Sequence, residues 1–244
     1  MSRYYVENTN LLLLSPYFPS SGNLLPPEVM QERYPLAWEY LNLQRCKAAL
    51  EGREEGKWRG HPNWYGYTRK NNHDKFGTGK PRIQTPSIAA QASYFYDSTG
   101  EHYLIGSGGG GGGGYGVELH DGVSEDNRFV SGLLNSRLLD HYLGYISTLF
   151  RGGYKAYSRQ YIAKLPIRQI DFSDATDKAM HDWLVALVER MLALQERLKP
   201  VRGTGFTEEH DLLQEVERVD SDIDNLVYDL YGLTEAERRL VEDV

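Results

Sequence analysis

Two long stretches in the last third of the sequence carry apolar residues at every third or fourth position. The first covers residues 180–198 and the second covers residues 208–230, and the stretch between them holds one proline and two glycines. Apolar residues with this spacing form one face of an α-helix. Thr234 and Glu237 have the spacing of a capping box, which begins a short last helix. We therefore expect an antiparallel helical hairpin, followed by a short helix, over residues 171–244.

Residues 1–170 have a different composition. They hold 16 of the 18 tyrosines, and glycine, proline, asparagine and aspartate separate their short apolar runs. Such runs predict short β-strands joined by loops, while helical spacing at residues 36–50 and 132–149 predicts two inserted helices. The expected fold class is α+β, with a mixed, β-rich lobe over residues 1–170 that contains the inserted helices and precedes the C-terminal antiparallel helical hairpin. The predicted strands are 10–14, 82–85, 93–96, 102–105 and 116–119.

The composition excludes several classes of protein. Hydrophobic residues make up 40% of the chain and charged residues 25%, as is typical of a water-soluble globular protein. No apolar stretch reaches the length of a membrane span, and the first residues lack the pattern of a signal peptide. Cys46 is the single cysteine, so it has no internal disulfide partner and suits a reducing compartment. We therefore expect a cytoplasmic protein without a membrane partner.

Charge is distributed unevenly along the chain. Residues 171–244 carry 19 acidic and 8 basic side chains, whereas residues 1–170 carry 15 acidic and 19 basic ones. Residues 57–82 hold seven basic side chains and one acidic side chain, and residues 151–168 hold five basic side chains and no acidic one. Such a distribution gives a basic surface that attracts a polyanion and an acidic end that remains in solvent.

The sequence shows no pattern of a catalytic, cofactor or metal site. Seven consecutive glycines at residues 108–114 satisfy a dinucleotide-binding pattern, but the following residues favour a strand instead of the helix that such a site requires. This run is either a flexible surface loop or a segment whose backbone passes close to another group, where a Cβ atom would clash. The seven histidines lack metal-ligand spacing. Residues 15–18, Ser-Pro-Tyr-Phe, resemble the base-holding motif of an adenine methyltransferase but lack its second proline.

Two basic segments supply the candidate DNA contacts. In residues 64–82, arginine and lysine side chains can donate hydrogen bonds to the edge of guanine, and asparagine side chains can form hydrogen bonds with the edge of adenine. Trp64, in contrast, is expected to pack in the core. In residues 150–159, glycines beside basic side chains allow the backbone to approach phosphate groups, whose charge the side chains neutralise. The candidate DNA-binding residues are Arg69, Lys70, Asn71, Asn72, Lys75, Lys80 and Arg82 in the first segment, and Arg151, Tyr154, Lys155 and Arg159 in the second.

Five short motifs follow one another in an order that resembles a known family. They are Trp-Tyr-Gly-Tyr at 64–67, Ile-Gln-Thr-Pro at 83–86, Leu-Leu-Asn-Ser at 133–136, Leu-Pro-Ile at 165–167 and Ile-Asp-Asn-Leu-Val-Tyr-Asp-Leu-Tyr-Gly-Leu-Thr at 223–234. In this order they resemble the TaqI-like C-terminal specificity domain. That domain is the target-recognition domain of adenine-specific DNA methyltransferases in type II restriction–modification systems. The resemblance covers nearly the whole chain.

The resemblance implies that the chain recognises a specific sequence in double-stranded DNA while methyl transfer occurs elsewhere. In that family an N-terminal methyltransferase domain binds S-adenosylmethionine and methylates the target adenine at N6. This chain is therefore expected to hold no cofactor, to be no enzyme by itself, and to have that domain as a partner. It would then be a C-terminal fragment with Met1 supplied by cloning, and an endonuclease fused to the parent enzyme stays possible. The alternative is a protein–protein interaction or assembly domain that acts through the helical hairpin.

The isolated chain is expected to transfer no methyl group to DNA, because none of its motifs can hold S-adenosylmethionine beside an extruded adenine. The measurement is the incorporation of labelled methyl groups from S-adenosylmethionine into a mixed pool of duplex DNA. Incorporation above that of a heat-denatured sample would contradict this expectation.

Overall fold

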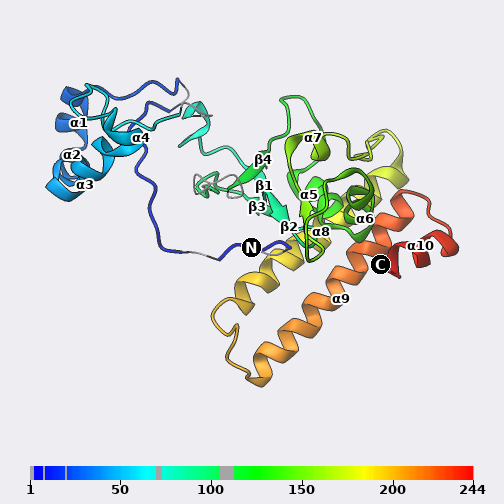
Figure 1. Cartoon of the computed structure of the whole chain (residues 1–244). Helices are drawn as coiled ribbons and strands as arrows, with labels where there is room; N and C mark the ends of the chain where they lie inside the picture. Colours follow the sequence, from blue (N-terminus) through cyan, green and yellow to red (C-terminus); the bar gives the residue numbers. More distant parts are fainter. Residues whose placement is uncertain (1–2, 8, 20, 70–72, 105–112, 244) are drawn as a thin grey trace. The chain divides into compact units, whose positions relative to one another are not determined.

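The computed structural model describes residues 3–7, 9–19, 21–69, 73–104 and 113–243. The chain divides into two compact units (Figure 1). Met1–Asn8 and Pro81–Val244 form the main unit, and Thr9–Lys80 form a second unit, called the insert. This division differs from the expected one near residue 170, because one hydrophobic core in the main unit includes residues on both sides of that position.

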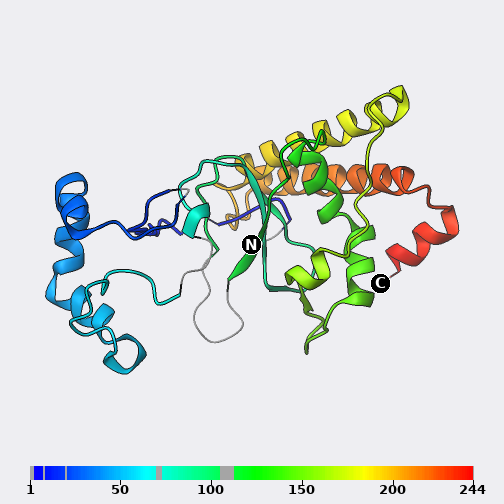
Figure 2. The same ribbon diagram turned by 90° about the horizontal axis from the view of Figure 1, so that it is seen from above.

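The expected helical hairpin is confirmed. Its two helices, α8 (Ala175–Leu198) and α9 (Thr207–Leu230), run antiparallel and lie side by side in both views (Figures 1 and 2). The Asp174 side chain caps α8 by accepting hydrogen bonds from the first backbone N–H groups. The predicted capping box begins α10 (Glu235–Glu242). Although α8 and α9 are long, no helix in the described part of the chain combines the length and apolar character that a membrane crossing requires.

Helix α5 (Asn127–Asn135) packs against α8 in the core of the main unit. The approach is closest at Gly132, where a Cβ atom would lie 3.0 Å from both Leu184 Cδ1 and Val188 Cγ2. The next helix is α6 (Arg137–Ile146). The single helix expected over residues 132–149 is therefore two helices, because Ser136 has an extended backbone and its side chain caps α6. The short α7 (Arg159–Ile162) follows later in the chain.

Two small antiparallel sheets complete the main unit, which confirms the α+β class. Strand β1 (Arg82–Pro86) lies between β3 (Phe95–Asp97) and β4 (Gly114–Val117), and Ile83 pairs with Tyr96 on one side and Val117 on the other. Strand β2 (Ile88–Ala89) pairs with β5 (Lys155–Ala156). Helix makes up 48% of the described residues and strand 9%, so helices dominate. The strands predicted at 10–14 and 102–104 are absent, and residue 105 lies outside the described residues.

The end of the glycine run is a point of close backbone approach. A Cβ atom at Gly114 would lie 2.3 Å from the carbonyl oxygen of Thr85 and 2.4 Å from Leu104 Cδ1. Because no side chain fits at these distances, the pairing of β4 with β1 requires glycine at this position. The close-approach interpretation therefore holds at Gly114, whereas residues 108–112 lie outside the described residues.

The insert is a small helical unit with its own core. Its helices are α1 (Pro27–Arg33), α2 (Pro35–Asn42), α3 (Gln44–Glu51) and α4 (Arg53–Gly56), followed by the 3-10 helix η1 (His73–Lys75). The helix expected over residues 36–50 is interrupted at Leu43, whose ψ of 133° is extended. Helix α1 was not predicted from the sequence. Trp64 is buried in the core with Met30 and Tyr65, as expected.

Two helical glycines are expected to respond to substitution in opposite directions. Gly132→Ala should lower the free energy of unfolding by about 1–2 kcal/mol, because the added methyl group overlaps the fully buried Leu184 and Val188. Gly144→Ala should raise it by about 0.5–1 kcal/mol through improved helix propensity, since the nearest atom to an added Cβ is Lys155 Cδ at 3.9 Å. Urea denaturation of the two variants and the wild type measures both effects. A stabilising Gly132→Ala would contradict the tight packing of α5 on α8.

Candidate nucleic-acid interface

The second basic segment forms a short β-hairpin over residues 149–155, called the 149–155 hairpin. Leu149 bridges to Lys155, and the Phe150 backbone N–H donates to the Tyr154 carbonyl oxygen at 2.7 Å. The turn is made by Gly152 and Gly153, whose φ angles of 85° and 79° lie in the region that favours glycine. The two glycines thus let the chain reverse tightly between Arg151 and Tyr154, whose side chains are both exposed.

Asp140 on α6 anchors this hairpin. Its carboxylate forms an ion pair with Lys155 Nζ at 2.8 Å and accepts a hydrogen bond from the Tyr157 hydroxyl at 2.6 Å. Burial, together with the charge of Asp140, raises the pKa of Tyr157, so the hydroxyl remains protonated and continues to donate. The Ser147 hydroxyl adds hydrogen bonds with the backbone of Ala156.

The expected role of Lys155 is therefore corrected. Sequence reasoning assigned this side chain to a DNA phosphate, but it is only 14% exposed and is engaged by Asp140. Its ammonium group stabilises the fold by holding the hairpin on α6. Arg151 and Arg159, in contrast, are exposed as a phosphate contact requires.

Exposed aromatic side chains also occur on α6 and the 149–155 hairpin, and sequence reasoning missed most of them. Tyr142, Tyr145, Phe150 and Tyr154 are exposed by 40%, 76%, 44% and 47%. No Asp or Glu occurs from residue 141 to residue 170. Tyr142 and Tyr145 share the helical spacing from which the helix over residues 132–149 was predicted, which placed them on its apolar face. The signal against that assignment was the spacing of Leu139, Leu143 and Ile146, which already completes one helical face.

The first basic segment is split between the two units. Arg69, Lys75 and Lys80 are exposed in the insert, and Lys70, Asn71 and Asn72 lie outside the described residues. Arg82 belongs to the main unit and is a second correction, because it is only 7% exposed. Its guanidinium donates to the Gly100 carbonyl oxygen and lies 5.2 Å from the centre of the Tyr103 ring. Arg82 therefore supports the loop after β3 and is not presented to a partner.

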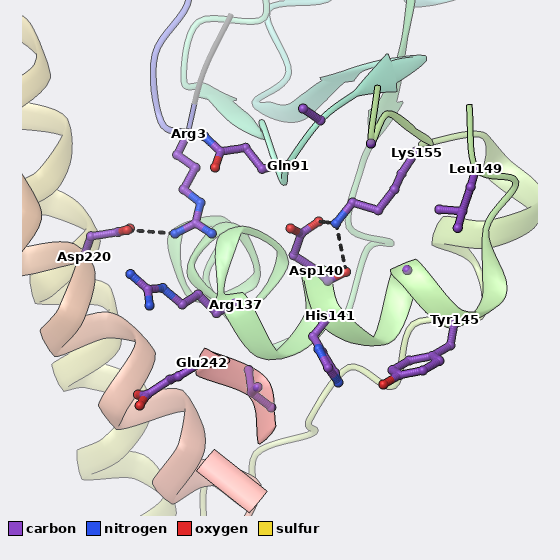
Figure 3. A pocket seen from close by; sticks show the side chains of 14 residues that line it. Arg3, Gln91, Arg137, Asp140, His141, Tyr145, Leu149, Lys155, Asp220 and Glu242 are labelled. Carbon is purple, nitrogen blue, oxygen red and sulfur yellow. Dashed lines mark hydrogen bonds and ion pairs between the residues drawn. The ribbon is translucent and has the colours of Figure 1, made fainter. Parts of the chain in front are cut away.

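A groove of about 910 Å³ runs along α6 beside the hairpin (Figure 3). Arg137, Asp140, His141, Gly144 and Tyr145 of α6 lie along it. The 149–155 hairpin forms one side, while α9 and α10 contribute to the other side. The groove is therefore continuous with the exposed basic and aromatic surface described above.

A buried carboxylate lies behind this groove. Asp224 on α9 is 4% exposed, accepts a hydrogen bond from the Arg137 backbone N–H at 2.8 Å, and forms an ion pair with Arg137 Nε at 3.1 Å. Burial raises its pKa to about 6, because the loss of water outweighs the hydrogen bond from Arg137 and the nearby positive charges. Asp220, one turn earlier, pairs with Arg3 at 2.7 Å.

No cluster of histidine, cysteine, aspartate and glutamate suited to a metal ion occurs among the described residues. Comparison with known proteins gives no relative: no protein-family model matches the chain, and no curated protein matches it.

The raised pKa of Asp224 predicts a pH-dependent stability. Between about pH 4 and about pH 6 the folded protein binds a proton that the unfolded chain, with an ordinary aspartate, does not bind. The contribution of this group to the free energy of unfolding should therefore fall by about 2–3 kcal/mol as the pH rises through that window, and should stay constant above it. Asp224→Asn should lack this fall.

The measurement is urea denaturation of the wild type and Asp224→Asn at several pH values from about 4 to about 7. Carboxylates remote from Asp224 contribute equally to both proteins, so the difference between the two curves reports Asp224 and its immediate charged neighbours. Asp222→Asn, at an exposed position of the same helix, is the matched control. A difference that does not vary with pH would contradict the prediction.

Proposed function

We propose that this chain recognises a specific sequence in double-stranded DNA for an N6-adenine methyltransferase of a restriction–modification system. Catalysis and S-adenosylmethionine binding belong to a separate N-terminal methyltransferase domain in this proposal. The observation that carries it is the exposed basic and aromatic surface formed by the 149–155 hairpin and the part of α6 after Asp140. No Asp or Glu occurs from residue 141 to residue 170. The order of motifs that resembles the TaqI-like specificity domain supports the same function.

The shape of the hairpin suits a DNA groove. The major groove of B-form DNA admits a two-stranded β-ribbon, and the glycine turn keeps the tip of this ribbon narrow. Arg151 beside the turn can contact phosphate or the acceptor edge of guanine, while Phe150 offers an apolar contact to a thymine methyl group. Arg159, at the first position of α7, adds a second exposed positive charge.

The insert supplies further basic side chains for the same ligand. Arg69, Lys75 and Lys80 are exposed there, and an arginine or lysine near the duplex contributes affinity by releasing counterions. Lys70, Asn71 and Asn72 keep their predicted role as base-reading residues. The DNA-binding residues proposed from the structure are thus Arg69, Lys75, Lys80, Arg151, Tyr154 and Arg159, without Arg82 and Lys155.

The helical hairpin suits a protein partner better than DNA. Residues 171–244 carry 19 acidic and 8 basic side chains, so this region repels phosphate. Trp183 on α8 and Leu240 on α10 are nevertheless exposed by 57% and 67%, and large exposed apolar side chains are typical of interaction surfaces. These two positions favour the second candidate function, a protein–protein contact, for which the methyltransferase domain is the proposed partner.

Arg151→Ala should weaken binding to duplex DNA of any sequence. If Arg151 contacts one phosphate, its loss removes one counterion-releasing contact, so the slope of log affinity against log salt should decrease by about one. The measurement is fluorescence anisotropy of a labelled random-sequence duplex over a series of salt concentrations.

Arg197→Ala is the matched control, because Arg197 is 65% exposed on the acidic α8. It should change neither the affinity nor the salt slope. Equal binding by Arg151→Ala and the wild type would remove the hairpin from the proposed interface, and the absence of any salt-dependent DNA binding by the wild type would overturn the proposed function.

A further inference from the structure

The groove on α6 has a balanced charge that does not suit a phosphate chain. Each of its three strongly basic side chains is paired with a carboxylate. Arg3 pairs with Asp220 at 2.7 Å and Lys155 with Asp140 at 2.8 Å (Figure 3), and Arg137 pairs with Asp224 at 3.1 Å. Glu242 adds a further carboxylate to the lining. Such a surface attracts a polyanion only weakly. The groove therefore favours a neutral, polar group of a ligand.

An aromatic pair lies along the same groove. Tyr145 is 76% exposed, and its ring lies 5.0 Å from the His141 ring at an interplanar angle of 75°. The two rings are nearly perpendicular, and the high exposure of Tyr145 leaves ring surface accessible to a ligand. An exposed aromatic face of this kind is the usual platform for an unpaired nucleobase, because every base has a face that can stack.

The groove also offers hydrogen-bonding groups and sufficient room. The Gln91 side chain and the Arg137 guanidinium both line it, and Arg137 remains 49% exposed despite its ion pair (Figure 3). An amide supplies both a donor and an acceptor, and a guanidinium supplies donors, which together match the edge of a base. The volume of about 910 Å³ lies within the range of small-molecule sites.

We propose that this groove binds one unpaired nucleobase of the DNA that the 149–155 hairpin contacts, with the base stacked on Tyr145. The proposal rests on the proposed DNA-binding function, because the hairpin that forms one side of the groove also belongs to the proposed interface. The base is neutral, which matches the charge balance of the groove, and it is flat, which allows stacking on the aromatic ring. Its polar edge can bind the hydrogen-bonding groups. A nucleotide extruded from the duplex beside the hairpin enters the groove without placing its phosphate among the carboxylates.

The test compares two duplexes with the full chain. One carries a single bulged 2-aminopurine, and the other has the same sequence without the bulge. The wild type should bind the bulged duplex about tenfold more tightly, which is the effect of one base–aromatic stack, and the 2-aminopurine fluorescence should be quenched on binding. Tyr145→Ala should abolish both the preference and the quenching, so that it binds the two duplexes equally.

Tyr142→Ala is the matched control. Tyr142 is an exposed tyrosine on the same helix that is not part of the groove lining, so its loss should leave the preference for the bulged duplex intact. Equal binding of the two duplexes by the wild type, or a preference that survives Tyr145→Ala, would overturn the groove proposal while DNA binding itself stands. If the wild type binds neither duplex, the proposed function fails and the groove proposal fails with it.

Discussion

The carboxylate of Asp140 receives the Lys155 ammonium at 2.8 Å and the Tyr157 hydroxyl at 2.6 Å. Both donors come from the segment that leaves the 149–155 hairpin, so this one side chain attaches the hairpin to α6. The attachment also places the hairpin along one side of the groove and leaves Arg151 and Tyr154 exposed beyond it. Because the side chains of Asp140 and Lys155 are 13% and 14% exposed, the pair is weakly screened by salt, and loss of either partner leaves a poorly solvated charge.

The charged residues of the chain divide into those that hold the fold and those that are presented to a ligand. Lys155 and Arg82 belong to the first group, because their charged groups bind Asp140 and the Gly100 carbonyl oxygen within the main unit. Arg151 and Arg159 belong to the second group. The number of basic residues in a sequence segment does not distinguish these two groups. The proposed interface depends only on the exposed group. The change of composition at residue 170 likewise suggested two domains, but a single core joins β1, α5, α8 and α9.

Several features followed from the sequence because their physical cause is local. The apolar spacing of α8 and α9 and the capping box of α10 each depend on residues within one or two helical turns. The central strand β1 was also predicted, over residues 82–85, from a short segment bounded by Pro81 and Pro86. The interruptions at Leu43 and Ser136 were missed, since the apolar spacing continues across both positions and the backbone geometry there changes over a single residue.

What the sequence by itself determined is the α+β class, the helical hairpin and the presence of two basic segments. Tertiary structure alone decided which basic side chains are exposed, where the chain divides, and that a groove lies beside the hairpin. The physical reason is the separation of the interacting residues along the chain. Arg137 and Asp224 are 87 positions apart, and Arg3 and Asp220 are 217 positions apart. No local pattern pairs side chains over such distances, because their contact arises only when the core brings α6, α9 and the N-terminal segment together.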